Sequence, residues 1–495
     1  MRNLTMLTDL YQLTMMQGYY SNGCQNKEAV FDVFFRSLPL GSGFAIAAGL
    51  EQVIDYIEHL HFTPEDLAYL RSLNMFGEDF LNQLRDFRFH GDMDAIPEGT
   101  VVFPYEPLVR VKGRIFETQF LETAILNLVN FETLIATKAS RVVAATEGGR
   151  VMEFGLRRAQ GPDAGVLGAR AAFIGGVQST SNVLAGKAYG IPVSGTQAHS
   201  WIQCFSSELE AFQAYARTFP EQCLLLVDTY NVLKSGVPNA ITVGLELERE
   251  GHHFLGIRID SGDLAYLSRE ARKLLDEAGL KEAIIVGSND LDEETIWAIR
   301  SQGAPIDAWG VGTHLITSKE TPSLGGVYKL AAEGEGGVFQ PRLKVSENVT
   351  KITNPGIKKV VRFYNKAGMA MADLIALEDE EFTEGPLTIF DPVQTWKQKI
   401  LRDFHTRELL VPVFHGGKRV YDLPSLTEIQ TYARKEVETL WAEVKRLTNP
   451  HHYIVDLSAE LYNLKQKLLR EVSEHVLLQQ NTGVSGGDSI PPEVK

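Results

Sequence analysis

Five short apolar segments in the middle of the chain, each ending in a polar residue, constrain the fold more than any other feature. Their polar ends are His199, Asp228, Asp260, Ser288 and Thr313, which follow one another at intervals of 25 to 32 residues. This interval accommodates a strand, a loop, a helix and a return, and uninterrupted apolar segments are typical of strands buried on both faces. The pattern predicts parallel strands that alternate with helices in a closed or nearly closed α/β barrel.

The polar ends of these segments predict one shared site. In such barrels the loops after the strands converge at one mouth, and reactive groups gather there. The residues expected at this mouth are His199, Asp228, Thr229, Asp260, Ser261, Asp263, Ser288, Asn289 and Thr313. Taken singly, each of these Ser, Thr, Asp and Asn residues is equally well explained as a helix N-cap. Five such ends in register favour a site.

Length and charge limit the classes of function. A chain of 495 residues is long enough for two or three domains, one of them a barrel. The net charge of −15 argues against a nucleic-acid surface, although a few arginines and helix N-termini can still hold a small anion. The sequence shows no segment long enough to span a bilayer and no basic start followed by an apolar core, so we expect a cytoplasmic protein without a membrane partner.

The three cysteines limit the possible covalent and metal chemistry. Cys24, Cys204 and Cys223 are an odd number, widely spaced and without a CxxC motif. This spacing argues against a structural disulfide or a zinc site and favours buried, small apolar side chains.

The pattern of elements divides the chain into four segments. Residues 121–143 show helical spacing of apolar positions and predict a long helix that leads into the barrel. We expect an N-terminal α+β lobe with this helix at 1–135, the α/β barrel with the active site at 136–340, a C-terminal segment with two helices that returns to the lobe at 341–478, and a disordered tail at 479–495.

Arginines and glycines near the predicted strand ends suggest an anion site. A guanidinium holds phosphate or carboxylate through two parallel bonds, and Arg157 and Arg258 are placed to do so. For Arg157 and its neighbour Arg158, solvated surface arginines are the alternative. Asp260 beside Arg258 offers oxygens for ribose hydroxyls or magnesium, with an internal ion-pair network as the alternative. Glycines in GSND and GVGT allow an anion to approach backbone N–H groups closely.

His199 is the most distinctive single residue. An imidazole can act as a nucleophile, a proton carrier or a metal ligand, and a structural histidine held by a hydrogen bond is the alternative. The absence of a second histidine three or four residues away argues against a common zinc site.

Twelve motifs of this sequence, taken in order, resemble the nicotinate phosphoribosyltransferases from about residue 4 to residue 365. They are LTDLYQLTM, FRSLP, EGTVVFPYEPLVRV, EFGLRRAQGPD, SNVLAG, GTQAHS, VDTYNV, IRIDSGD, SND, GVGT, LGGVYKL and the stretch from KVSEN to NPGIKKVVR. The resemblance implies a type II phosphoribosyltransferase fold, which is an incomplete α/β barrel with an α+β lobe formed by the N- and C-terminal segments.

The resemblance also implies an activity. Members of this family join nicotinate to 5-phosphoribosyl 1-diphosphate in NAD biosynthesis, forming nicotinate mononucleotide and diphosphate. ATP hydrolysis, with Mg²⁺, drives this glycosyl transfer through a phosphohistidine. A homodimer with shared active sites is implied as well.

The motifs carry over specific roles to residues of this chain. His199 corresponds to the histidine that takes the phosphoryl group, and Asp228 to a residue that binds magnesium or the coupling nucleotide. The substrate-binding residues are Thr196, Arg157, Arg258, Asp260, Phe154 against one face of the pyridine ring, and Tyr11 reaching the other face from the partner subunit. The ribose 5-phosphate is assigned to Gly287, Ser288, Gly310, Gly312 and Thr313. His314 departs from the pattern, since relatives often have a small residue there.

Other activities remain open at this point. A nicotinamide phosphoribosyltransferase has the same fold, although GTQAHS and GLRRAQGPD resemble the nicotinate enzymes more closely. The repeat also suits a barrel lyase or isomerase of a phosphosugar, with Asp260 or His199 as the base. A catalytically silent scaffold finds no support, because every expected polar end is present.

Overall fold

The middle of the sequence forms a curved parallel sheet. The computed structural model describes residues 3–382 and 385–481, and within these residues six parallel strands pair in the order β7-β6-β11-β10-β9-β8. Their bounds are β6 (Arg150–Glu153), β7 (Ser179–Thr180), β8 (Leu224–Leu226), β9 (Gly256–Ile259), β10 (Ile284–Ser288) and β11 (Ala308–Val311). The sheet ends at β7 and β8 without closing, so the predicted incomplete barrel is confirmed.

The first of the five apolar segments does not form the predicted strand. Apart from a single parallel bridge between Val193 and Thr180, the segment has no strand pairing. Pro192 lacks an N–H to donate, and Gly195 weakens extended structure further, so a continuous ladder cannot form. The segment instead runs beside β7, at the edge of the sheet, and leads into α9 (His199–Gln203).

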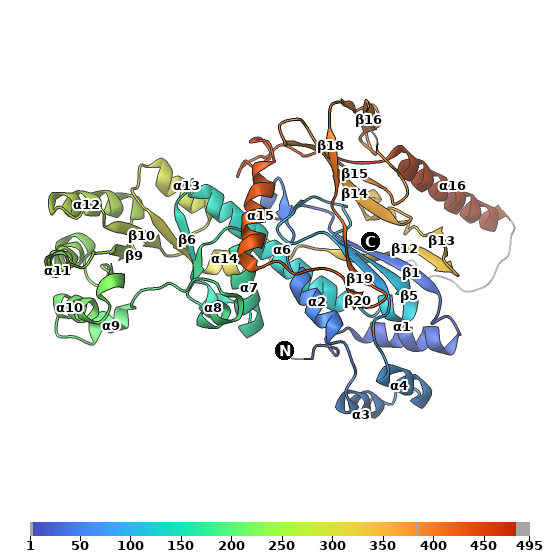
Figure 1. The fold of residues 1–495 in the computed structure, drawn as a ribbon, viewed down its shortest axis with the longest axis horizontal. Coiled ribbons are helices and arrows are strands. Elements are labelled where there is room, and N and C mark those ends of the chain that lie inside the picture. The colour runs from blue at the N-terminus through green and yellow to red at the C-terminus, as the bar shows by residue number, and fades with distance from the viewer. Residues whose placement is uncertain (1–2, 383–384, 482–495) are drawn as a thin grey trace.

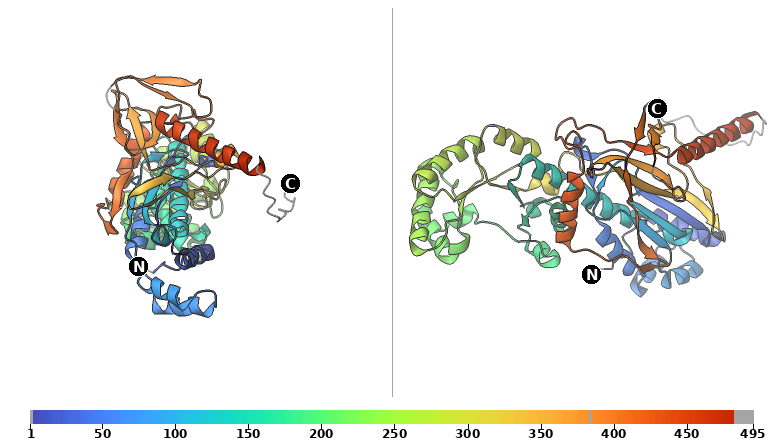
Figure 2. Two further views of the ribbon diagram at one scale, coloured as in Figure 1. Left: turned by 90° about the vertical axis from the view of Figure 1, so that its right-hand side faces the viewer. Right: turned by 45° about the horizontal axis from the view of Figure 1, so that its top comes forward.

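Helices cover the outer face of this sheet (Figures 1 and 2). They are α9, α10 (Glu208–Thr218), α11 (Val237–Glu250), α12 (Leu264–Glu277) and α13 (Glu293–Ser301). Ser207, Asp263 and Asp292 cap α10, α12 and α13 by accepting a hydrogen bond from the third backbone N–H of each helix. Asp263, expected at the mouth of the barrel, therefore also serves as an N-cap.

Four helices lie between the half-barrel and the rest of the chain (Figure 1). They are α6 (Glu122–Ala145), α7 (Pro162–Ile174), α8 (Val183–Tyr189) and α14 (Thr313–Ile316). The predicted lead-in helix is confirmed as α6, and its buried side chains include Leu128, Ile135 and Val142.

The lobe is built from distant parts of the chain. Among the described strands, seven pair in the order β13-β12-β1-β5-β3-β19-β20. Their bounds are β1 (Glu28–Phe34), β3 (Asp92–Ala95), β5 (Val109–Arg114), β12 (Val327–Glu335), β13 (Val338–Pro341), β19 (Val411–His415) and β20 (Lys418–Arg419). N- and C-terminal segments thus share one sheet, as predicted. The sheet also takes in β12, so the expected boundary at residue 340 does not coincide with the start of the returning strands.

The remaining N-terminal elements surround this sheet. They are α1 (Leu10–Ser21), α2 (Leu50–Glu58), α3 (Pro64–Ser72), α4 (Glu78–Arg85), α5 (Ile115–Thr118) and the short pair β2 (Ala45–Ile46) and β4 (Val101–Val102). The packing of Phe62, Phe87 and Phe120 against one another gives this lobe an aromatic core, with ring centroids 5.2 to 5.8 Å apart.

The C-terminal segment adds a second sheet and the two predicted helices. The described strands β18 (His405–Glu408), β14 (Lys358–Tyr364), β15 (Ala370–Leu377) and β21 (Val455–Leu457) pair in that order, and β16 (Leu387–Phe390) pairs with β17 (Gln398–Leu401). The helices are α15 (Leu426–Glu438) and α16 (Ala459–Asn481). The predicted tail begins three residues before the end of α16, and its part from residue 482 lies outside the described residues.

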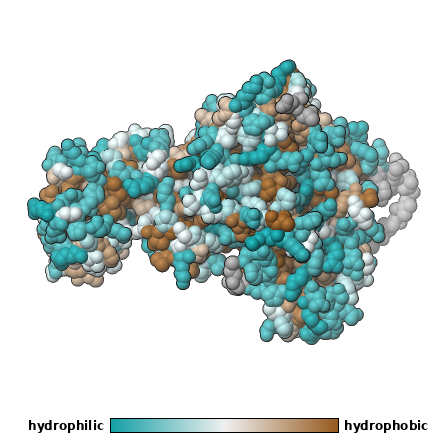
Figure 3. All heavy atoms as spheres, viewed as in Figure 1, coloured by the Kyte–Doolittle hydropathy of each residue, from teal (hydrophilic) through white to brown (hydrophobic). Residues whose placement is uncertain are grey.

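On the face shown in Figure 3, hydrophobic residues are scattered among hydrophilic ones. Among the described helices, none combines the length and the apolar character that crossing a bilayer requires. The three cysteines are free, but only Cys223 is buried and Cys204 is exposed, so the expected burial is wrong for Cys204.

Candidate active site

Arg258 binds three of the other residues that the sequence singled out. Its Nε donates to Ser288 Oγ (2.8 Å), one terminal nitrogen donates to Thr196 Oγ1 (2.8 Å), and the other donates to Asp260 Oδ1 (2.6 Å). Ser288 Oγ also donates to Asp260 Oδ1. The guanidinium is therefore fixed by three neighbours at the carboxyl ends of β9 and β10, where its charge can act on an anion.

Phe154 forms an aromatic wall beside this arginine. The Arg258 guanidinium carbon lies 5.4 Å from the centroid of the Phe154 ring, a distance at which a cation interacts with the face of the ring. A Cβ at Gly310 would lie 2.7 Å from two carbons of the same ring. The absence of a side chain at Gly310 thus leaves room for the Phe154 ring.

Glu153 is a residue of the site that sequence reasoning missed. It is fully buried at the end of β6, where its carboxylate accepts hydrogen bonds from the Gly155 backbone N–H and from Thr180 Oγ1. Burial raises the pKa of this carboxyl group above its usual value. These bonds fix the turn that carries Phe154 and tie β6 to β7. In the sequence, a glutamate between the apolar residues Met152 and Phe154 was the only local signal, and its role depends on the pairing of β6 with β7.

His199 and Asp228 form a second cluster. His199 Nδ1 lies 3.1 Å from Thr229 Oγ1, and its Nε2 lies 4.0 Å from Asp228 Oδ1. Ser261 Oγ donates to Asp228 Oδ2 at 2.6 Å. His199 is partly exposed, with 42% of its side chain accessible, whereas Asp228 is buried. The imidazole is thus open to a reactant on one side and faces a carboxylate on the other.

Asp228 has unused hydrogen-bonding capacity. Its Oδ1 is buried and has no hydrogen-bond partner among the described residues. An unpartnered buried carboxylate oxygen is costly, and a hard cation is the kind of ligand that satisfies it. This oxygen therefore fits the predicted magnesium ligand.

The two clusters lie next to each other. Thr196 and His199 are three residues apart on the segment beside β7, and Asp260 and Ser261 are consecutive after β9. The structure accordingly brings the polar ends of β8, β9 and β10 together with the His199 segment. Below them, the curved sheet borders a cavity of about 360 Å³. Its lining combines apolar strand residues such as Met152, Leu224 and Val286 with polar residues such as Arg150 and Gln178.

The remaining predicted anion-binding residues flank this site. Arg157 is exposed in a short 3-10 helix that follows Phe154, and it makes no hydrogen bond or ion pair to the residues that the structure describes. Gly312 and Thr313 form the turn after β11, at which α14 begins. Gly287 has a packing role, because a Cβ there would lie 3.1 Å from the Ile306 side chain.

Tyr11 lies apart from these residues within one chain. It is on α1, which Figure 1 shows on the lobe, away from the strand ends of the half-barrel. Its side chain is 46% exposed and borders a cavity of about 350 Å³ between α1 and α6. A role for Tyr11 at the site therefore requires a second copy of the chain.

Fold and site together define a class of protein. A parallel half-barrel with arginine, hydroxyl and glycine groups at its strand ends, joined to a lobe from both ends of the chain, is the architecture of the type II phosphoribosyltransferases. Family models of the nicotinate phosphoribosyltransferase N-terminal domain, the family itself and its C-terminal domain match residues 6–130, 150–332 and 357–465. The chain belongs to the nicotinate phosphoribosyltransferase family.

Individual relatives resemble the chain over most of its length. A nicotinate phosphoribosyltransferase of Bacillus subtilis is 45% identical over 476 residues, covering 96% of this chain and 97% of the relative. The crystal structure of human nicotinic acid phosphoribosyltransferase has a TM-score of 0.81 and 32% identity, covering 93% of this chain and 99% of that one. A nicotinate-nucleotide pyrophosphorylase from Pyrococcus furiosus shares the fold, with a TM-score of 0.68, 23% identity and coverage of 88% and 96%.

Proposed function

We propose that this chain transfers the 5-phosphoribosyl group of 5-phosphoribosyl 1-diphosphate to nicotinate, coupled to ATP hydrolysis, in NAD biosynthesis. Family membership and the relatives named nicotinate phosphoribosyltransferase support the transfer. The structural observation that carries the proposal is the bonding of Arg258 to Ser288, Thr196 and Asp260 next to an aromatic ring. This arrangement offers a cation, hydroxyls and a flat apolar wall to a phosphorylated sugar and a pyridine ring.

The transfer forms one bond and breaks another. The ring nitrogen of nicotinate attacks the anomeric carbon while the bond from that carbon to the diphosphate oxygen breaks. Positive charge develops on the ribose and negative charge on the departing diphosphate, so cationic groups fixed in advance lower the barrier. Arg258 is such a group, because its neighbours hold it in place before the substrate arrives. Positioning accounts for most of the remaining catalysis.

Binding is shared among the flanking residues. Asp260 accepts hydrogen bonds from the ribose hydroxyls, and the turn of Gly312 and Thr313 with Ser288 holds the 5-phosphate. Arg157 remains free to pair with the nicotinate carboxylate or with a phosphate. Phe154 covers one face of the pyridine ring.

Tyr11 of the partner subunit covers the other face in this proposal. The chain then works as a homodimer with shared active sites. Support comes from Tyr11 itself, which is exposed on α1, whereas Phe154 directly follows β6 of the half-barrel. Figure 1 shows α1 on the lobe, away from the half-barrel.

Asp228 would hold Mg²⁺ through its unpartnered Oδ1, and Ser261 orients the same carboxylate through Oδ2. The ion supplies positive charge that neutralises the phosphate oxygens of a bound substrate.

ATP is coupled to the transfer through His199. An imidazole nitrogen attacks the γ-phosphorus, the bond to the β,γ-bridging oxygen breaks, and ADP leaves. Water later hydrolyses the phosphohistidine to phosphate and returns the neutral imidazole. Asp228, 4.0 Å from Nε2, stabilises positive charge on the ring.

A labelling experiment tests this coupling. Incubation with γ-phosphate-labelled ATP should give acid-labile, base-stable label on the protein, and His199→Ala should remove it. The same variant should keep slow ATP-independent transfer and lose the stimulation by ATP. Retention of the label in His199→Ala would place the phosphoryl group on another residue.

The choice of base is tested by competition. Nicotinate and nicotinamide are supplied at equal concentration with 5-phosphoribosyl 1-diphosphate, and nicotinate mononucleotide should be the main product. A preference for nicotinamide would assign the chain to the other branch of the fold. Turnover of a phosphosugar without 5-phosphoribosyl 1-diphosphate would instead indicate a lyase or isomerase.

A further inference from the structure

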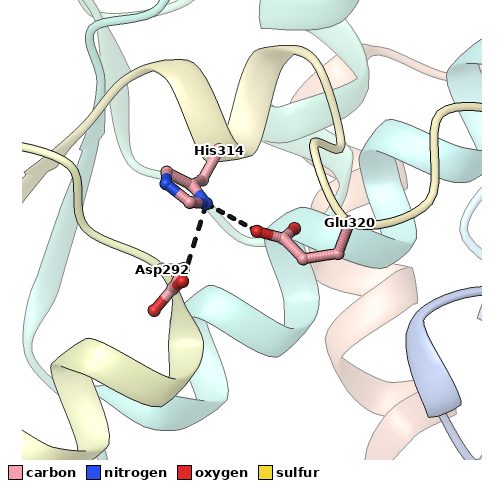
Figure 4. A group of neighbouring side chains, drawn as sticks. All are labelled: Asp292, His314 and Glu320. Atoms are coloured by element: carbon pink, nitrogen blue, oxygen red, sulfur yellow. Dashed lines mark hydrogen bonds and ion pairs between the residues drawn. The ribbon is translucent and has the colours of Figure 1, made fainter.

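His314 directly follows the turn assigned to the 5-phosphate, and its side chain is held by two carboxylates (Figure 4). Its Nδ1 lies 2.5 Å from Glu320 Oε1 and 3.5 Å from Asp292 Oδ2. Only 12% of the His314 side chain is exposed. The residue that departs from the family pattern is therefore firmly placed beside the predicted site.

Glu320 connects His314 to the helix between the two parts of the molecule. Lys138 on α6 donates from Nζ to Glu320 Oε2 and to Glu293 Oε2, both at 2.6 Å. Arg141, one turn further along α6, donates to Glu293 Oε1 at 2.8 Å. Lys138 and Glu293 are buried, so these are fixed contacts rather than mobile surface pairs.

Glu320 stays charged across the working pH range. Burial alone would raise its pKa, but hydrogen bonds from Lys138 and His314 lower the pKa to about 2. At neutral pH the carboxylate is therefore an anionic acceptor for His314.

The turn needs such an anchor because α14 is short. This helix spans Thr313–Ile316 and is too short to be stable by itself. Its first residue is also the residue assigned to phosphate binding. Tertiary contacts must fix its position, and His314 supplies a charge-assisted one.

We propose that His314 is a positioning residue for the substrate's 5-phosphate. Its bond to Glu320, and through Glu320 to Lys138, holds the turn of Gly312 and Thr313 ready for the anion, so less binding energy is spent on ordering it. The inference rests on the proposed function in that it assigns this turn to the 5-phosphate.

The same side chains also resemble a metal site. One ligand atom each from Asp292, His314 and Glu320 lies within 4.8 Å of the others. Two ammonium groups oppose a cation there, since Lys138 binds Glu320 and Lys319 Nζ lies 3.3 Å from His314 Nε2. The ion-pair interpretation is therefore favoured.

Steady-state kinetics of variants tests the proposal. His314→Ala should raise the KM for 5-phosphoribosyl 1-diphosphate about tenfold, the effect of losing one charge-assisted hydrogen bond. The kcat and the KM for nicotinate should stay within about twofold. Glu320→Ala should raise the KM for 5-phosphoribosyl 1-diphosphate as much as His314→Ala does. The double variant should show little further increase over either single variant. His314→Asn, which keeps a donor near the Nδ1 position, should recover most of the affinity.

Glu294→Ala is the matched control, because Glu294 is exposed on α13 next to Glu293 and lies outside these contacts. It should leave both KM values unchanged. A lower melting temperature in His314→Ala with an unchanged KM for 5-phosphoribosyl 1-diphosphate would show a purely structural role and overturn the proposal.

Calorimetric titration with ribose 5-phosphate separates this inference from the proposed function. The wild type should bind it about ten times more tightly than His314→Ala, whether or not the protein makes nicotinate mononucleotide. Equal binding by the two proteins would overturn the inference even if the transfer activity is found. Stoichiometric Zn²⁺ binding that His314→Ala abolishes would also overturn it in favour of a metal site.

Discussion

The guanidinium of Arg258 and the hydroxyl of Thr196 are joined by a hydrogen bond of 2.8 Å across the open half-barrel. Arg258 is on β9, near one edge of the curved sheet, whereas Thr196 is on the segment that runs beside β7 at the other edge. The strands do not close the barrel, but this contact connects its two sides at the mouth. It also places the segment that ends at His199.

Arg258→Lys tests whether this geometry matters beyond charge. A lysine keeps the positive charge but cannot bind Ser288, Thr196 and Asp260 in one plane. We expect kcat/KM for 5-phosphoribosyl 1-diphosphate to fall about 100-fold or more. Lys273→Arg, on the exposed face of α12, is the control and should have no effect. A decrease below threefold in Arg258→Lys would mean that charge alone suffices.

Gly310→Ala tests the position of the aromatic wall. The added methyl group would lie 2.7 Å from the Phe154 ring, so the ring must leave its present position. We expect the KM for nicotinate to rise about tenfold, since the pyridine ring loses its stacking surface. In the background of Phe154→Ala the same change should have little further effect. Independent, additive losses would show that Gly310 acts through something other than Phe154.

Mixing two impaired variants tests whether Tyr11 acts across a dimer. Tyr11→Ala and His199→Ala homodimers should each be impaired. After subunit exchange, half of the chains in a random mixture are in heterodimers, in which one of the two sites is intact. Activity should therefore recover toward about a quarter of the wild-type value. Activity that remains at the level of the unmixed variants would argue that Tyr11 serves its own chain or none.

Glu132 should give the folded protein a distinctive pH dependence. Desolvation raises its pKa to about 8, more than the nearby Arg170 lowers it. The unfolded carboxyl group has a pKa of about 4.3, so the stabilisation by protonated Glu132 is complete below that pH and is lost as the pH rises to about 8. Glu132→Gln should remove this decrease, worth up to about a few kcal/mol, in denaturant unfolding measured from pH 5 to pH 9. An identical slope in both proteins would contradict the assignment.

The sequence predicted the parts of the site that depend on local pattern. Continuous apolar segments ending in Asp228, Asp260, Ser288 and Thr313 were enough to place β8 to β11 and the polar residues after them, because strand period and length are local properties. For the segment before His199 the predicted strand is wrong, because Pro192 has no N–H to donate to a regular ladder of backbone hydrogen bonds.

The rest depends on contacts between residues far apart in the chain. Glu153 becomes a buried anchor only when β6 pairs with β7, and Glu320 meets Lys138 across more than 180 residues of sequence. In the proposed function, Tyr11 reaches the site from a second copy of the chain. No local pattern reports such long-range pairings, which is why these roles were missed or remain predictions.

The most direct measurement supplies the purified protein with nicotinate, 5-phosphoribosyl 1-diphosphate, Mg²⁺ and ATP and follows the products. We predict nicotinate mononucleotide and diphosphate, with ADP and phosphate formed alongside and the stimulation by ATP lost in His199→Ala. Formation of no mononucleotide by the wild-type protein under these conditions would contradict the account.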